Sequence, residues 1–178
     1  MTNGIIKNFA GNRNEWFRLM LFVGFYVLLD YCYFKIPIDL FVNVIYYHGV
    51  VVICADVINM IAPHEQVLPQ LNHLLSVNTD LEIVRGCDGA GMLFLVASAI
   101  LVFPSKLSQK LKGLVLGIGL IYMVNLWRII LLYFVIAHHS DWFQLIHIYL
   151  APTFMVIVGC TYFAWWGFNS LDNSNESA

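Results

Sequence analysis

Charged residues are scarce in this sequence. Only 11% of its 178 residues are Asp, Glu, Lys or Arg, whereas soluble domains carry about 25% charged residues. Hydrophobic residues make up 60% of the chain, in runs long enough to cross a bilayer, which takes about 20 apolar residues per helix. The lack of charge excludes an ordinary soluble domain and predicts an all-α polytopic membrane protein.

An excess of positive charge and closely spaced cysteine pairs are also missing. The formal net charge is −2, which gives no reason to expect a nucleic-acid partner. No C-x-x-C pair occurs among the cysteines, so neither dithiol redox chemistry nor a zinc knuckle is supported. The four cysteines are Cys32, Cys54, Cys87 and Cys160. We expect no cofactor and no metal.

The apolar runs predict a helical bundle of four to five transmembrane helices. The clear spans are residues 16–34, 89–103, 113–137 and 148–168. Residues 40–62 are apolar but interrupted by polar side chains, so we expect an extra interfacial or re-entrant helix before Cys87, and whether it crosses stays open. A loop at 63–69 and polar surface structure at 70–84 should follow. We expect one domain over 1–178, with its core at 80–168 and a disordered tail at 169–178.

Positive charge indicates the orientation of the bundle. Lys7, Arg13 and Arg18 precede or open the first span, and residues 105–112 form a loop with three lysines and no acid. Basic loops stay in the cytoplasm. With four spans, both termini lie inside, whereas Cys87 and His147 lie at the outer side.

Cys87 is a candidate nucleophile. It stands in the segment Arg85-Gly-Cys-Asp-Gly-Ala-Gly91, directly before an apolar run. A helix beginning at Asp88 or Gly89 would favour thiolate over thiol through its dipole, and Arg85 adds positive charge. The alternative is a buried structural cysteine, which is the interpretation for the other three.

Arg128 lies in the middle of a predicted span. Placing an arginine at the centre of a bilayer costs about 3 to more than 10 kcal/mol of free energy. Arg128 should face the bundle interior, together with Asn125 on the same helical face. If its helix ends near Ala137, Arg128 lies about 14 Å below the outer end. The site must then be a funnel, or the loop with Cys87 must sink toward it. A structural tie to Asp30 or Asp56 is the alternative.

His147 opens the last span from the outer loop predicted at residues 138–147. Its imidazole suits a general acid or base, although a lone histidine there could also be an interfacial polar residue. His138 and His139 compete for the role. A haem or metal site remains an alternative, but it would need paired histidines on facing spans.

Thiol, guanidinium and imidazole together suit acyl transfer. The thiolate would attack a peptide carbonyl, His147 would protonate the leaving amine, and Arg128 would stabilise the oxyanion. Asn125, Asp88 and Arg85 are candidate substrate-binding residues beside this triad. A non-enzymatic assembly or transport component is the other class of function, in which Cys87 would be dispensable.

The same motifs resemble the exosortase/archaeosortase family. They are Arg85-Gly-Cys-Asp-Gly-Ala with its apolar run, Val124-Asn-Leu-Trp-Arg128-Ile-Ile, and Asp141-Trp-Phe-Gln-Leu-Ile-His147-Ile-Tyr-Leu. The resemblance covers about residues 80–168 and is greatest to short, single-module members such as the exosortase H group.

The resemblance implies a multi-pass cysteine transpeptidase of the bacterial inner membrane, with its active site facing the periplasm or outside. Cys87, Arg128 and His147 would be its catalytic triad. Its substrates would be secreted proteins with a C-terminal sorting signal of the PEP-CTERM kind, cleaved and passed to a lipid-linked or polysaccharide acceptor. Membrane lipid would surround it, and no nucleic acid would take part.

One departure from the family concerns the histidine. Many members carry a glutamate two or three residues before the cysteine, whereas this chain has Val84 and Arg85 there. The acid that orients His147 would then be either missing or supplied by Asp88 or Glu82.

Overall fold

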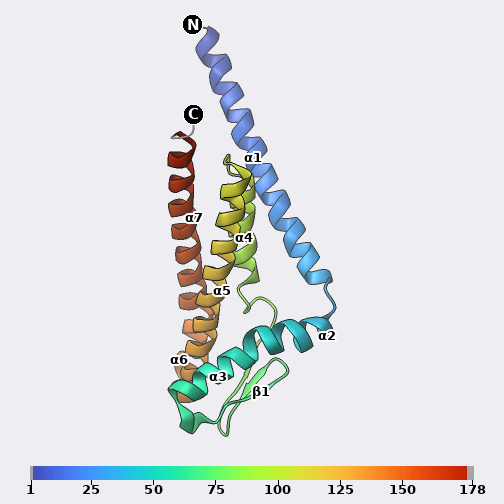
Figure 1. Cartoon of the computed structure of the whole chain (residues 1–178), viewed down its shortest axis with the longest axis vertical. Coiled ribbons are helices and arrows are strands. Elements are labelled where there is room, and N and C mark those ends of the chain that lie inside the picture. The colour runs from blue at the N-terminus through green and yellow to red at the C-terminus, as the bar shows by residue number, and fades with distance from the viewer. Residues whose placement is uncertain (1, 176–178) are drawn as a thin grey trace.

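The computed structural model describes the backbone of residues 2–175 and the side chains of residues 14–170. Four helices run along the long axis of the molecule (Figure 1). They are α1 (Thr2–Lys35), α4 (Ala90–Val102), α5 (Leu107–His138) and α7 (Ala151–Asn175). This arrangement confirms the all-α polytopic membrane fold.

Helix length and apolarity agree with membrane crossing. Segments Asn14–Lys35, Ile38–Ile61, Leu107–His138 and Ser140–Ser170 are each long and apolar enough to span a bilayer. α4 has only 13 residues, which extend about 20 Å, less than the roughly 30 Å of a hydrocarbon core. α4 is therefore too short to cross the hydrocarbon core by itself.

A continuous helical segment runs across the bundle, near the end where the sheet and α6 lie, instead of along it (Figure 1). It consists of α2 (Ile38–Leu40), the π-helical η1 (Phe41–Val51) and α3 (Val52–Ile61). Its buried face packs on the C-terminal half of α5 in one apolar cluster. This is the extra helix that the sequence predicts before Cys87. Because Ile38–Ile61 is also long and apolar enough to span a bilayer, whether residues 40–62 cross the membrane stays open.

A small antiparallel sheet follows, where the sequence predicts a loop and unspecified polar structure. After the short turn η2 (Pro63–Glu65), strands β1 (Leu68–Gln70), β2 (His73–Leu75) and β3 (Asp80–Glu82) pair in the order β1-β2-β3. The Asn59 side chain fixes the sheet to α3 through two hydrogen bonds with the backbone of Val67, at 2.9 and 2.8 Å. Strands of three residues are too short to show an alternating pattern in the sequence.

The outer loop predicted at 138–147 is wrong, because this stretch is mostly helical. The chain breaks at His139 (φ −144°), and α6 (Ser140–Leu145) then continues through the π-helical η3 (Ile146–Leu150) into α7. His147 therefore lies on a helix. At the other end, α7 extends to Asn175, into the segment where the sequence predicts a disordered tail; residues 176–178 lie outside the described chain.

The ends of the elements sort into two groups (Figure 1). The beginning of α1, the α4–α5 connection and the end of α7 lie at one end of the molecule, and the sheet and α6 lie toward the other. This agrees with the four-span arrangement expected from the basic residues. Which end faces the cytoplasm stays a prediction.

Candidate active site

Cys87 lies on a tight turn between β3 and α4. The Cys87 backbone N–H donates to the Val84 carbonyl at 3.0 Å, which closes a four-residue β-turn. Gly86, its third residue, has a φ of +96°, a conformation that glycine adopts at little cost. The turn presents Cys87 at the start of the short helix α4.

His147 reaches this cysteine from the far end of the chain. The Cys87 Sγ and His147 Nε2 atoms are 3.6 Å apart, within hydrogen-bonding range for sulfur. The imidazole stacks on Phe143, with 5.2 Å between ring centroids and 10° between ring planes. Phe143 precedes His147 by one helical turn, so it fixes the plane of the ring while Nε2 faces the thiol.

Arg128 completes the cluster from α5. Its Nη1 donates to the Cys87 carbonyl oxygen at 3.3 Å. The loop with Cys87 therefore sinks to the arginine, which is one of the two arrangements expected from the depth of Arg128. Among the described residues, no Asp or Glu forms an ion pair with Arg128, and its buried Nε has no hydrogen-bond partner.

The pKa of the Cys87 thiol is raised above its ordinary value. Burial is the largest cause and the negative charge of Asp88 adds to it, whereas the positive charge of Arg128 and its hydrogen bond lower the pKa. Burial disfavours the thiolate because it removes water from the charge. The expectation of a depressed pKa from the helix dipole is thus wrong, and the thiol needs a base to remove its proton.

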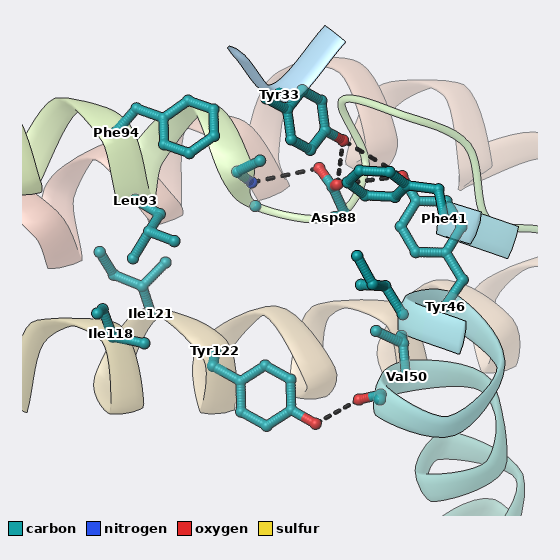
Figure 2. Close-up of a pocket in the computed structure, with 14 residues that line it drawn as sticks. Tyr33, Phe41, Tyr46, Val50, Asp88, Leu93, Phe94, Ile118, Ile121 and Tyr122 are labelled. Atoms are coloured by element: carbon teal, nitrogen blue, oxygen red, sulfur yellow. Dashed lines mark hydrogen bonds between the residues drawn. The ribbon is translucent and has the colours of Figure 1, made fainter. Parts of the chain in front are cut away.

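Asp88 is directed into a cluster of tyrosines (Figure 2). Its carboxylate accepts hydrogen bonds from Tyr33, from Tyr46 at 3.0 Å and from the Ala90 backbone N–H at 3.2 Å. These donors come from α1, η1 and α4. Asp88 thus ties the cysteine loop to three elements, beside a mostly apolar cavity of about 280 Å³.

No carboxylate orients His147 among the described residues. Its Nδ1 atom is buried without a hydrogen-bond partner. Asp88 is engaged by the tyrosines, and Glu82 accepts a hydrogen bond from Asn72 at 3.2 Å. Of the two alternatives, the structure agrees with a missing acid and not with Asp88 or Glu82 as the group that orients His147. The imidazole is instead held by stacking on Phe143.

Arg85 holds the end of α1. Its guanidinium donates to the carbonyls of Phe34 at 3.2 Å and Ile36 at 2.5 Å, and its Cζ lies 4.6 Å from the centroid of the Phe41 ring. Arg85 and Asp88 thus anchor both sides of the cysteine turn. A contact of either side chain with substrate stays a prediction.

Asn125 is buried, with 2% of its surface exposed. It lies under Gly89, where a Cβ atom would come within 3.1 Å of the Asn125 Cγ. Gly89 itself has a φ of +76° and caps α4. Asn125 therefore supports the start of α4 from below, and its proposed role in binding substrate is untested.

The other histidines of the outer end do not compete for the thiol. His138 Nε2 lies 3.2 Å from Glu65 Oε1, and its ring stacks on Phe134. His139 is exposed. Within the described part of the chain, no three His, Cys, Asp or Glu side chains are grouped so that they could hold a metal ion.

Sequence reasoning missed Tyr33, Tyr46 and Phe143. The two tyrosines are 55 and 42 residues from Asp88, so no local pattern connects them. Phe143 could have been found, because side chains four residues apart on a helix are neighbours.

Two cavities reach Arg128 from the sides of the bundle. One, of about 250 Å³, lies between α1, α4 and α7 and is bordered by Gly86 and Gly89 of the cysteine loop. The other, of about 390 Å³, lies between α5 and the η3–α7 helix. The arginine is therefore the deepest polar group that a molecule entering between the helices would meet.

Comparison with known sequences gives one family. The family model described as "Transmembrane exosortase (Exosortase_EpsH)" matches residues 13–165. No curated protein and no solved structure matches the chain.

Proposed function

The chain belongs to the transmembrane exosortase family, and on that basis we propose that it is a membrane cysteine transpeptidase with Cys87 as its nucleophile. It cleaves C-terminal sorting signals of the PEP-CTERM kind from secreted proteins and transfers the new C-terminus to a lipid-linked or polysaccharide acceptor. The observation that carries the proposal is the 3.6 Å contact between Cys87 Sγ and His147 Nε2. These residues are 60 positions apart in the sequence.

Each of the three side chains has a role in the first half-reaction. His147 Nε2 accepts the thiol proton while Sγ attacks the carbonyl carbon of the scissile peptide bond. Arg128 donates to the oxyanion that forms. The C–N bond then breaks, His147 gives its proton to the departing amine, and the substrate remains as a thioester on Cys87.

The second half-reaction returns the enzyme to its starting state. The acceptor nucleophile loses its proton to His147 and attacks the thioester carbonyl. The C–S bond breaks, and the sulfur leaves as a thiolate that takes back the proton. Water in place of the acceptor gives hydrolysis by the same steps.

The site opens toward the outside of the bacterial inner membrane in this proposal. Support comes from the basic residues at the opposite end, which is cytoplasmic by the positive-inside rule. The predicted lysine loop at 105–112 is wrong, because Lys106 precedes α5 and Lys110 and Lys112 lie in its first turns, but the lysines stay at the same end as the beginning of α1 (Figure 1).

Substitution of the cysteine tests the proposal. In cells that co-express a sorting-signal substrate, Cys87→Ala should abolish processing, and Cys87→Ser should nearly do so because a hydroxyl is a far weaker nucleophile than a thiolate. Cys160→Ala is the matched control, since Cys160 is an exposed helical residue away from the site. Normal processing by Cys87→Ala would remove the proposed function.

Arg128→Lys tests how the oxyanion is stabilised. Lysine keeps the charge but loses the planar fork of donors, so kcat should fall by about 100-fold, as for the loss of an oxyanion-hole donor. Wild-type turnover would show that a point charge suffices.

A further inference from the structure

The two edges of the small sheet differ in their capacity to accept another strand. Across β2 and β3, the Ile83 N–H donates to the Asn72 carbonyl and the Ser76 N–H donates to the Thr79 carbonyl, both at 2.8 Å. In an antiparallel pair, residues alternate between bonding to the partner strand and pointing away from it. Asp80 and Glu82 therefore direct their backbone N–H and C=O groups away from β2, to the outer edge of β3.

The opposite edge is closed. In the register of the sheet, Leu74 pairs with Leu81 of β3 on one side and with Pro69 of β1 on the other. Because Leu74 exchanges its hydrogen bonds with β3, Pro69 faces outward from β1, and proline has no N–H to offer. β1 also lies against η1 and α3. Only the β3 edge has both donors and acceptors for a new strand.

The β3 edge leads directly to the nucleophile. Only Ile83 separates Glu82 from the turn that begins at Val84 and ends at Cys87. Along this path Val84 is 45% exposed and Gly86 is exposed. A polypeptide lying along β3 would therefore arrive beside Cys87 within one turn of the chain.

We propose that the free edge of β3 binds the substrate by β-strand addition, as an extended segment on the N-terminal side of the scissile bond. The inference rests on the proposed function and names the surface that holds the acyl-donor substrate. The sheet lies at the outer end of the bundle, so it meets the part of the substrate that has already left the membrane. Main-chain hydrogen bonds supply the affinity, as in other cases of strand addition.

Proline at the edge tests the inference. Glu82→Pro removes the outward N–H and places the ring against an incoming strand, but it leaves the β2–β3 hydrogen bonds in place. With the full-length enzyme in liposomes and a sorting-signal peptide, we expect kcat/KM to fall by about tenfold, mainly through KM. Glu82→Ala is the matched control, because it removes the same side chain and keeps the N–H; the difference in kcat/KM between Glu82→Ala and Glu82→Pro therefore measures the contribution of the N–H.

Substrate analogues provide a test that does not depend on the folding of a variant. N-methylation of single amides before the scissile bond should weaken processing by the wild-type enzyme at every second residue, because only alternate amides face β3. The inference would be overturned if Glu82→Pro had the same kcat/KM as Glu82→Ala, or if the wild-type enzyme processed every N-methylated peptide equally well. In both cases the wild-type enzyme still processes its substrate, so the proposed function would stay intact. Absence of processing by the wild-type enzyme would overturn both.

Discussion

At the residue scale, the charges around Cys87 act on its thiol in opposite directions. Burial sets its pKa above the ordinary value of 9.0, Arg128 lowers it and Asp88 raises it. Since only the thiolate reacts with alkylating reagents, the pH at which the reagent reacts half-maximally reports this pKa.

The first prediction concerns that pH dependence. Arg128→Gln should move the midpoint of Cys87 alkylation by iodoacetamide to higher pH, because it removes the charge that favours thiolate. Asp88→Asn should move it to lower pH, because it removes a charge that opposes thiolate. Labelling of the Cys87→Ala variant is subtracted to isolate this site. Shifts in the same direction for both variants would contradict the charge assignment.

The glycines on both sides of Cys87 give the second prediction. Gly86 and Gly89 both have positive φ, so alanine at either position should cost about 1 kcal/mol in backbone strain. A Cβ at Gly86 meets nothing within 4 Å, whereas one at Gly89 lies 3.1 Å from the Asn125 side chain. Gly89→Ala should therefore reduce processing more than Gly86→Ala.

A double variant separates strain from contact at Gly89. Asn125→Ala in the Gly89→Ala background removes the contacts with Cγ and Oδ1 at 3.1 and 3.2 Å but keeps the contact with Cβ at 3.2 Å. It should therefore restore part of the loss that is due to the clash and leave the part that is due to φ. If the double variant loses as much processing as its two single variants combined, the Asn125 side chain does not contact the Cβ of alanine at position 89.

Much of the site was predictable at this scale, and the reason is chemical. Arg128 lies inside a span and Cys87 lies among small residues, where neither side chain packs well. Their presence in the sequence therefore indicates a functional role. The raised pKa of Cys87 was not predictable, because burial depends on the helices that cover the loop. The tyrosines around Asp88 were hidden for the same reason.

At the element scale, close contact between α5 and α7 gives the third prediction. A Cβ on Gly113 would overlap the Trp166 indole nitrogen, and this indole donates to the Gln109 carbonyl at 3.2 Å. Gly113→Ala should therefore force the tryptophan to move and destabilise the protein by about 1–3 kcal/mol. Thermal unfolding in detergent, followed by circular dichroism, measures the effect.

The same helix contains the matched control. A Cβ on Gly119 would meet nothing within 4 Å, so Gly119→Ala should leave the stability unchanged or raise it by up to about 1 kcal/mol through helix propensity. Equal destabilisation by the two substitutions would show that the α5–α7 contact is not tight at Gly113.

Hydropathy predicted where the long helices lie in the sequence. The four lengthwise helices follow from apolar runs, since a bilayer demands length and apolarity and little else. The crosswise direction of residues 38–61 does not follow, because this segment is also long and apolar enough to span. Its direction is set by packing of Tyr46, Val51 and Ile58 on the C-terminal half of α5, which is a tertiary effect.

At the scale of the whole molecule, the fourth prediction concerns orientation. Val77 lies in the tight connection between β2 and β3 and is 87% exposed. An epitope tag inserted after Val77 should bind antibody in intact spheroplasts, whereas a tag after Ala178 should bind only after permeabilisation. The reverse pattern would place the cysteine site in the cytoplasm and contradict the proposed function.

Pro69, on the closed edge of the sheet, limits how copies of this protein can associate. Two molecules could join their sheets only through their β3 edges, and such a dimer would cover the path from β3 to Cys87 in both copies. Asp80 and Glu82 would then face the same acids of the second copy, and like charges facing each other across paired strands repel. The enzyme should thus keep its specific activity as its density in the membrane rises, and neutralising both carboxylates should make it inhibit itself when crowded.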